Sequence, residues 1–257
     1  GAYNVGTNPG DQFPTLTGAG GLFAALNGGI IAGNITIRIT TDLVEDGSND
    51  LNDISYDVPN ANYTLRIVPS SATERVISGN SALGLIRFDG NDYVTIDGNN
   101  GLDASGAKYL RFRNTNGSAP TFSFFNDSKS NTITNCIIES NNTNTTTQPG
   151  TILFGTTTKS GGNDSNSITD CDLRDRSDAA GLPANLIVCN GSTGTTAQYN
   201  DYITISGCNL YNFYLDGESA RSGAIILWGG ASNWTVTNNS IYQEATRTYT
   251  AAAIIHP

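Results

Sequence analysis

The sequence predicts an all-β protein, a parallel β-helix whose short strands wind into stacked coils behind a short N-terminal helix. A motif of Thr or Ser, Ile, Thr, Asn or Asp, and Cys recurs at intervals of roughly 31–37 residues. A second apolar run precedes each copy, and Gly, Asn, Asp and Ser separate the runs. Strand-forming residues dominate both runs, and no stretch inside a period has the apolar spacing of a helix.

The N-terminal residues 15–27 ("TLTGAGGLFAALN") predict the helix. Glycines 28 and 29 follow it and provide a stop signal. We expect the helix to lie over the open end of the first coil, so that residues 1–33 form an N-terminal cap. The apolar residues at helical spacing are Leu16, Ala19, Phe23 and Leu26.

Residues 34–257 predict the coils. The alternating runs 34–40 ("NITIRIT") and 63–69 ("YTLRIVP") begin them, joined by an acidic loop at 42–57. Each period cannot bury its apolar side alone, so stacking places equivalent residues above one another. One predicted inward row is Ile133, Ile168, Ile205 and Val236. A second is Ile138, Leu173, Leu210 and Ile241, and the bend between them holds Asn135, Asp170, Gly207 and Asn238.

Three of the four cysteines occupy one position of the repeat, and an asparagine takes that position in the last copy. Stacked residues have parallel Cβ directions, whereas a disulfide needs Cβ atoms about 3.8 Å apart. We therefore expect a buried ladder of reduced thiols, with a disulfide as the alternative in an oxidising compartment. A zinc site is not expected, because the chain has no C-x-x-C pair. The ladder residues are Cys136, Cys171, Cys208 and Asn239.

The charge balance excludes some partners. The chain has 23 acidic and 13 basic residues, a net charge of −10, so a nucleic-acid groove and an anionic membrane surface are not expected. No apolar run is long enough to span a membrane. Charged residues are only 14% of the chain, and amides and hydroxyls supply most of the surface polarity. This composition, together with the absence of Met, indicates a secreted protein at the cell surface whose leader has been removed.

Several stretches together resemble the large secreted right-handed β-helix proteins of Bacteroidetes-type bacteria, many of which use the type IX secretion route. The resemblance covers residues 3–242 and implies a right-handed helix and an adhesin-like surface protein. It also implies a C-terminal sorting domain, which residues 243–257 do not resemble. The stretches that carry it are "YNVGTNPGDQFPTLTGAGGLFAALNGGIIAGNITIRI", "RFDGNDYVTIDGNN", "TILFGTT", "SNSITDCDL" and "SNWTVTNNSIYQ".

One outward position of the repeat predicts a ligand-binding face. Tyrosines and an arginine on a flat face stack on sugar rings and bond to hydroxyl groups, which suggests polysaccharide. The alternative is that tyrosine is simply a favourable residue on a half-exposed strand. The residues at this position are Glu139, Arg174, Tyr211 and Tyr242, and we expect Trp228 and Trp234 to extend the face.

The sequence predicts no catalytic set. His256 is the sole histidine, so no other histidine is available for a Ser-His-Asp or Cys-His catalytic set. The acids Asp170, Asp172, Asp175 and Asp178 form a cluster in sequence around Arg174 and Arg176, but acids do not recur at the position of Asp172 in other periods. No cofactor is expected, except that calcium could bind in the loop 42–57 through Asp46, Asp50 and Asp53.

These observations favour a non-catalytic extracellular adhesin or cell-surface structural module that binds polysaccharide on a coil face. One alternative is a carbohydrate-active enzyme, a lyase or hydrolase of acidic polysaccharide. Another is a self-assembling filament or surface-layer subunit. The chain ends just after an apolar run at 251–255, so we expect the coils to continue beyond residue 257 or to associate with another copy.

Overall fold

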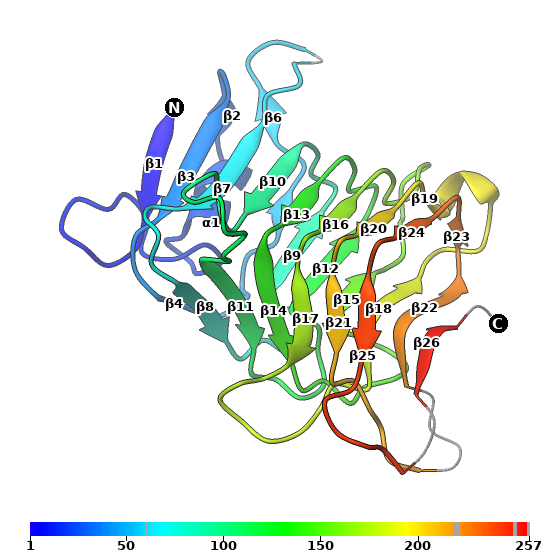
Figure 1. The fold of residues 1–257 in the computed structure, drawn as a ribbon. Helices are drawn as coiled ribbons and strands as arrows, with labels where there is room; N and C mark the ends of the chain where they lie inside the picture. The colour runs from blue at the N-terminus through cyan, green and yellow to red at the C-terminus, as the bar shows by residue number, and fades with distance from the viewer. Residues whose placement is uncertain (60, 218–221, 249–250, 256–257) are drawn as a thin grey trace.

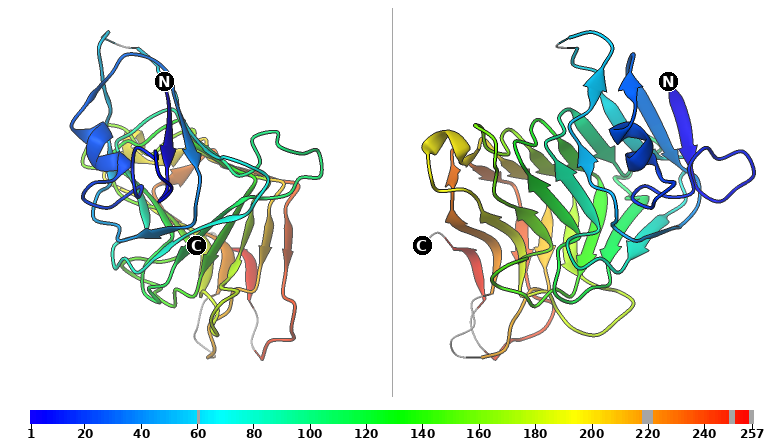
Figure 2. Two further views of the ribbon diagram at one scale, coloured as in Figure 1. Left: turned by 90° about the vertical axis from the view of Figure 1, so that its left-hand side faces the viewer. Right: turned by 180° about the vertical axis from the view of Figure 1, so that it is seen from behind.

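The computed structural model describes residues 1–59, 61–217, 222–248 and 251–255 of the chain. The chain forms a parallel β-solenoid of about 7 turns, and only 4% of it is helical. Figure 1 and Figure 2 show three sheets running side by side along the axis around a common core. The predicted all-β, parallel β-helical architecture is confirmed.

Each turn contributes one strand to each sheet, and β1 adds an eighth strand to sheet 1. Sheet 1 contains β1 (Ala2–Val5), β3 (Ile35–Ile39), β7 (Leu65–Pro69), β10 (Val94–Asp97), β13 (Thr132–Thr134), β16 (Ser167–Thr169), β20 (Thr204–Ser206) and β24 (Thr235–Thr237). Sheet 2 contains β4 (Leu43–Glu45), β8 (Arg75–Gly79), β11 (Leu110–Asn114), β14 (Cys136–Ser140), β17 (Asp172–Asp175), β21 (Asn209–Tyr211) and β25 (Ser240–Tyr242). Sheet 3 contains β5 (Leu51–Asn52), β9 (Ile86–Asp89), β12 (Phe122–Phe125), β15 (Ile152–Phe154), β18 (Asn185–Asn190), β22 (Gly223–Gly229) and β26 (Ala252–Ile255).

Smaller elements decorate the turns. They are the strand pairs β2 (Ile30–Ile31) with β6 (Ser55–Tyr56) and β19 (Asn200–Asp201) with β23 (Ala231–Ser232), the helix α1 (Leu22–Asn27) and the 3-10 helix η1 (Thr196–Gln198).

Both predicted inward rows are confirmed by the strand register. Ile133 pairs with Ile168, and the same row continues through Ile205 to Val236. In sheet 2, Ile138 pairs with Leu173, and that row continues through Leu210 to Ile241. Each fully buried aliphatic side chain contributes roughly 2 kcal/mol, so these rows supply much of the driving force for stacking. Sheet 3 adds aromatic residues, among which Phe124 and Phe154 stack with ring centroids 4.7 Å apart.

The bend between sheets 1 and 2 uses left-handed backbone. Asn135, Asp170, Gly207 and Asn238 have φ values of 53°, 52°, 69° and 57°. Asn and Asp tolerate this conformation better than other residues with a side chain, because they hydrogen-bond locally. The residues that the repeat places at the bend therefore turn the chain there, as predicted.

Polar residues form a buried ladder at the corner between sheets 3 and 1. Asn91, Ser128, Asn163 and Asn200 lie on successive coils and are each 0% exposed. The Asn163 amide donates to Asn200 Oδ1 at 2.8 Å, and the Ser128 backbone N–H donates to Asn163 Oδ1 at 3.1 Å. Buried amides cost free energy unless they are bonded, so each rung requires the next coil to be in register.

The predicted thiol ladder is also present. Cys136, Cys171 and Cys208 are buried and unoxidised, and the backbone N–H of Cys136 donates to Cys171 Sγ at 3.4 Å. Asn239 takes the next position and accepts a hydrogen bond from the backbone N–H of Cys208 at 2.9 Å. Burial raises the pKa of the Cys171 thiol, which keeps it protonated. These cysteines behave as small apolar side chains.

The N-terminal helix is shorter than predicted. α1 covers Leu22–Asn27 rather than 15–27, and Ala19 is exposed. The preceding residues are held by Glu45 of β4, because its carboxylate accepts the backbone N–H groups of Leu16 and Thr17, each at 2.7 Å. This buried carboxylate was not anticipated from the sequence.

The segment 1–33 also contributes to the solenoid itself. β1 pairs with β3 and forms the edge of sheet 1. Leu16, Leu22 and Phe23 are at most 1% exposed and belong to the same core cluster as the first coils. These residues therefore share one apolar core with the first coils.

The last coil is much less covered. Ile254 of β26 is 48% exposed, whereas Ile225, which precedes it in the same row, is 0% exposed. Val236 and Ile241 are partly buried, while their row neighbours Ile205 and Leu210 are completely buried.

Candidate functional site

The outward face of sheet 2 brings together four of the residues that the repeat predicted. Glu139 is paired with Arg174 in the ladder, and Tyr211 is paired with Tyr242. Leu173 pairs with Leu210, so Arg174 and Tyr211 occupy neighbouring positions and the row is continuous. A parallel outward row two residues earlier in each strand contains Arg111, Ile137, Asp172, Asn209 and Ser240.

Glu139 belongs to the outward row, but it is not exposed. Its side chain is 0% exposed because three guanidinium groups enclose its carboxylate. Arg111 and Arg174 contact Oε1 at 2.7 and 2.8 Å, and Arg113 contacts Oε2 at 2.6 Å. Charge-assisted bonds of this kind offset the cost of burying a carboxylate, so Glu139 organises the arginines.

A loop folds over the arginines after β17. Ser177 Oγ accepts hydrogen bonds from Arg111 at 2.7 Å and from Arg113 at 2.9 Å. Asp178 pairs with Arg113 at 3.0 Å, and Arg176 donates to both of its carboxylate oxygens at 3.0 and 3.1 Å. Arg176 also reaches the carbonyl of Thr115 at 3.3 Å, so the loop extends back toward β11 (Figure 1). We call Arg111, Arg113, Arg174 and Arg176 the arginine cluster.

The two tyrosines form a parallel stack. Their ring centroids are 4.8 Å apart and their planes differ by 4°. Tyr211 therefore has one ring face covered by Tyr242, while Tyr242 is 43% exposed. Burial raises the pKa of Tyr211 to about 12, so its hydroxyl stays neutral at physiological pH. Within the described ranges neither hydroxyl makes a hydrogen bond, which leaves both able to bond to a ligand.

The two tryptophans do not extend the row. Trp228 belongs to β22 in sheet 3, where it packs against the cluster of Leu153, Val188 and Ile226. Trp234 is turned into the core: its indole N–H donates to the carbonyl of Asn200 at 2.8 Å, and its ring meets Phe154 edge to face. Strand alternation in the sequence did not distinguish inward from outward tryptophan, because Trp228 lies at a register shift between Leu227 and Gly229 and Trp234 lies just before β24.

The carboxylates of the segment 169–178 are largely engaged. Asp172 pairs with Lys108 at 3.3 Å and accepts a hydrogen bond from Asn209 at 2.8 Å. Asp175 accepts from Asn212 at 3.0 Å, and Asp178 is held by arginines as described. Glycoside hydrolysis needs two carboxyl groups that face one substrate together, and these three side chains each have a different partner.

An acidic pocket of about 450 Å³ lies at the corner between sheets 3 and 1, away from the sheet 2 face. Asp53, Asp89, Asp92 and Asp127 line it, and burial raises the pKa of Asp92 to about 6. The sequence signal was present, because "FDGND" (88–92) and "FNDSK" (125–129) place acids at the same corner of successive coils. The site residues predicted from the sequence do not include this pocket.

The aspartates proposed for calcium are apart from one another. Asp46 accepts hydrogen bonds from Ser48, Asp50 pairs with Arg87 at 3.2 Å, and Asp53 lines the acidic pocket. In the part of the chain that the structure describes, no group of three or more His, Cys, Asp or Glu side chains is arranged to hold a metal ion. His256 lies outside the described residues.

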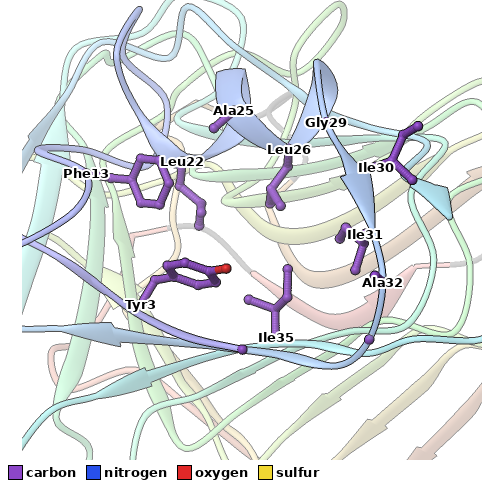
Figure 3. A pocket seen from close by; sticks show the side chains of 12 residues that line it. Tyr3, Phe13, Leu22, Ala25, Leu26, Gly29, Ile30, Ile31, Ala32 and Ile35 are labelled. Atoms are coloured by element: carbon purple, nitrogen blue, oxygen red, sulfur yellow. The ribbon is translucent and has the colours of Figure 1, made fainter. Parts of the chain in front are cut away.

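A second hollow of about 430 Å³ lies at the N-terminal end. Figure 3 shows that Tyr3, Leu22, Leu26 and Ile35 point toward it from β1, α1 and β3. Its lining is predominantly apolar, and Ile30 beside it is 72% exposed. It carries no charged or catalytic side chain among its lining residues.

Arg111 and Arg113 are the site residues that sequence reasoning missed. Only 26 residues separate Arg113 from Glu139, which is shorter than the spacing of the cysteine motif. The coil of β11 also lacks that motif, so aligning the motif copies skips it. The alternation in "LRFRN" (110–114) was the available signal, because it places both arginines outward.

Comparison with known proteins adds no identification. No protein-family model, curated protein or solved structure matches the chain. Among the described residues, none of the helices has the length and apolar character needed to cross a membrane.

Proposed function

We propose that the chain is a non-catalytic extracellular β-solenoid, an adhesin or cell-surface structural module, which binds polysaccharide on the outward face of sheet 2. The observation that carries the proposal is the continuous row of Arg174, Tyr211 and Tyr242. Arg174 uses Nη2 to bond to Glu139, and its Nε and Nη1 make no bond to other described residues. The row thus offers guanidinium N–H groups, two phenol hydroxyls and an exposed aromatic ring, which are the groups that recognise sugars.

A wider identity accompanies this proposal. The quoted stretches imply a secreted protein of Bacteroidetes-type bacteria that has a right-handed solenoid. They also imply export by the type IX route. The burial of Leu22 and Phe23 supports a capping role for the N-terminal segment. The amide-rich surface and the low proportion of charged residues support an extracellular location.

The engaged carboxylates favour binding over catalysis. An acid and a base need to be free to exchange protons with the substrate, and the acids of sheet 2 bond to Lys108, to asparagines or to the arginine cluster. The enzyme alternative, a polysaccharide lyase or hydrolase, would have to act through a different set of residues or through a rearranged loop.

The test is binding and turnover measured together. The chain is titrated with soluble polysaccharides by calorimetry, and the products are assayed for new reducing ends and unsaturated uronates. We expect saturable binding without turnover, and about tenfold weaker binding for Tyr242→Ala. Tyr202→Ala is the matched control, because Tyr202 is 63% exposed and lies outside sheet 2. Turnover that disappears in Asp172→Asn would overturn the proposal and favour the enzyme.

Self-assembly is a second candidate, favoured by the exposed interior of the last coil. Ile254 is 48% exposed, and an open strand edge accepts another strand. Under this candidate the mass measured by light scattering rises with protein concentration, and Ile254→Lys keeps the protein monomeric. A monomer over the whole concentration range would remove this candidate.

A further inference from the structure

We propose that the sheet 2 face takes an acidic glycan, a polysaccharide with carboxylate or sulfate groups, and that Asp178 occupies the binding site in the free protein. This inference rests on the proposed polysaccharide binding and specifies its ligand class. The loop after β17 then acts as an internal competitor, which an anionic sugar displaces.

The first support is the concentration of positive charge. The chain has 13 basic residues among 257, yet four arginines converge at one place on sheet 2. Their ion-pair partners are three carboxylates, those of Glu74, Glu139 and Asp178, so the arginine cluster and its partners together carry one positive charge in excess. The net charge of −10 does not prevent local binding of an anion, because salt screens charges beyond about 8 Å under physiological conditions.

The three carboxylates differ in how easily a ligand could replace them. Glu139 is 0% exposed and forms part of the sheet. The side chains of Glu74 and Asp178 are 39% and 41% exposed, at the outer side of Arg111 and Arg113. An incoming carboxylate or sulfate can take over the bonds of an exposed partner, since guanidinium groups bind both anions through paired N–H groups.

The loop that carries Asp178 is attached to the sheet mainly by these contacts. Arg176, Ser177 and Asp178 reach the sheet through side-chain bonds to β11 and to the carbonyl of Thr115. Backbone hydrogen bonds appear only at its far end, where Ala184 N–H donates to Asn142 and Pro183 accepts from Tyr214. Breaking the ionic contacts would therefore release residues 176–182 while their anchors remain in place.

The neighbouring row completes the site. Arg174 joins the arginine cluster to Tyr211 and Tyr242, so a sugar chain along the row would place its anionic groups at the arginines and one ring against Tyr242. A neutral glycan would gain nothing from displacing Asp178. The acidic class is the one whose binding makes use of the whole cluster.

The experiment compares Asp178→Asn with Asp175→Asn. Both changes remove one negative charge from the same coil, but Asp175 bonds to Asn212 and not to an arginine. Binding of polygalacturonate, dextran sulfate and neutral dextran to the folded chain is measured by calorimetry at two salt concentrations. We expect both acidic polymers to bind and dextran not to bind, with weaker binding at high salt. Asp178→Asn should bind about fivefold tighter and Asp175→Asn should be unchanged.

The outcomes separate the two proposals. Binding of neutral dextran as strong as that of the acidic polymers keeps the polysaccharide proposal and overturns the acidic class. Unchanged or weaker binding by Asp178→Asn overturns the competitor role, because a purely structural ion pair gives no gain when it is removed. Absence of binding to all three polymers overturns both.

Two further measurements keep the test decisive. Arg174→Gln, at a side chain that is 22% exposed, should weaken binding of acidic polymers about tenfold while circular dichroism stays unchanged. Arg113 is not used, because it is the only described ion-pair partner of Glu139 Oε2, whereas Arg111 still contacts Oε1 when Arg174 is changed. A single-stranded oligothymidylate is included as a phosphate polyanion. Its binding with equal affinity would overturn recognition of a glycan in favour of general polyanion binding.

Discussion

The two ends of the solenoid differ although the coils between them repeat. At the N-terminal end, Ile37 and Leu51 are fully buried in the first coil, and non-repeating residues such as Leu16 and Phe23 belong to the same core cluster. At the C-terminal end, Ile254 is 48% exposed. A coil buries its apolar face only against a neighbour, so each end needs residues that the repeat does not supply. The repeat thus determines the stacked coils, and separate residues determine the structure that precedes the first coil.

The backbone edges differ in the same way. The N-terminal edge strand β1 is bonded by its own chain, because the N–H groups of Gln12 and Phe13 donate to the Asn4 carbonyl at 3.1 and 3.3 Å. Glu45 then fixes the residues that follow by accepting from Leu16 and Thr17. No described segment bonds in this way to the outer edges of β24, β25 and β26.

The largest expected effect is on the free energy of unfolding, when the same residue type is replaced at two positions of one row. Ile77 and Ile241 both lie in the inward row of sheet 2, but Ile77 has a coil on each side. We expect Ile77→Ala to lower the free energy of unfolding by about 4 kcal/mol and Ile241→Ala by about 1 kcal/mol. Urea titration followed by circular dichroism measures both. Equal losses would mean that the last coil is covered in solution, and the contrast between the ends would fail.

A smaller effect is expected at the residue that fixes the N-terminal segment. Glu45→Ala leaves three donors of Leu16 and Thr17 without their partner in a buried place, which should cost about 3 kcal/mol. The corresponding change near the other end is Glu244→Ala. Glu244 is exposed and bonds to Asn212, so its loss should cost less than about 1 kcal/mol. Thermal unfolding of both variants checks the difference, and similar shifts would show that Glu45 has no special role.

The smallest effect concerns local opening. Cys136 is the first cysteine of the thiol ladder and lies farthest from the exposed last coil, whereas Cys208 is the last cysteine before that coil. Because a buried thiol reacts only when the coil opens, we expect iodoacetamide to label Cys208 at least about tenfold faster than Cys136. Mass spectrometry of peptides after timed labelling measures both rates in the same sample, with labelling in urea as the full-reaction control. Equal rates would mean that the solenoid opens as a single unit.

Much of the fold was predictable because stacking converts sequence spacing into spatial alignment. Ile133, Ile168 and Ile205 could be placed in one row from their spacing alone, and the left-handed bend followed from Asn135 and Asp170. The helix was predicted too long, because apolar spacing did not reveal that Glu45 holds Leu16 and Thr17.

The site was less predictable because its contacts skip coils. Arg111 meets Ser177 across 66 residues, and neither residue belongs to the repeated motif. Glu139, Arg174 and the tyrosines could be placed in one row, but the burial of Glu139 depends on arginines from an unrecognised coil. Loops that cross the solenoid follow no period, so a periodic pattern gives no information about where they attach.

The amide ladder at the corner of sheets 3 and 1 has a consequence for how such a chain can lengthen. Asn163 and Asn200 each stand four residues before a strand, β16 and β20 respectively. The residues ahead of them vary in number from coil to coil, yet the strands that follow remain aligned. The ladder therefore restores the alignment of the strands once per turn. A longer surface loop on one coil consequently does not shift the strands of the next coil.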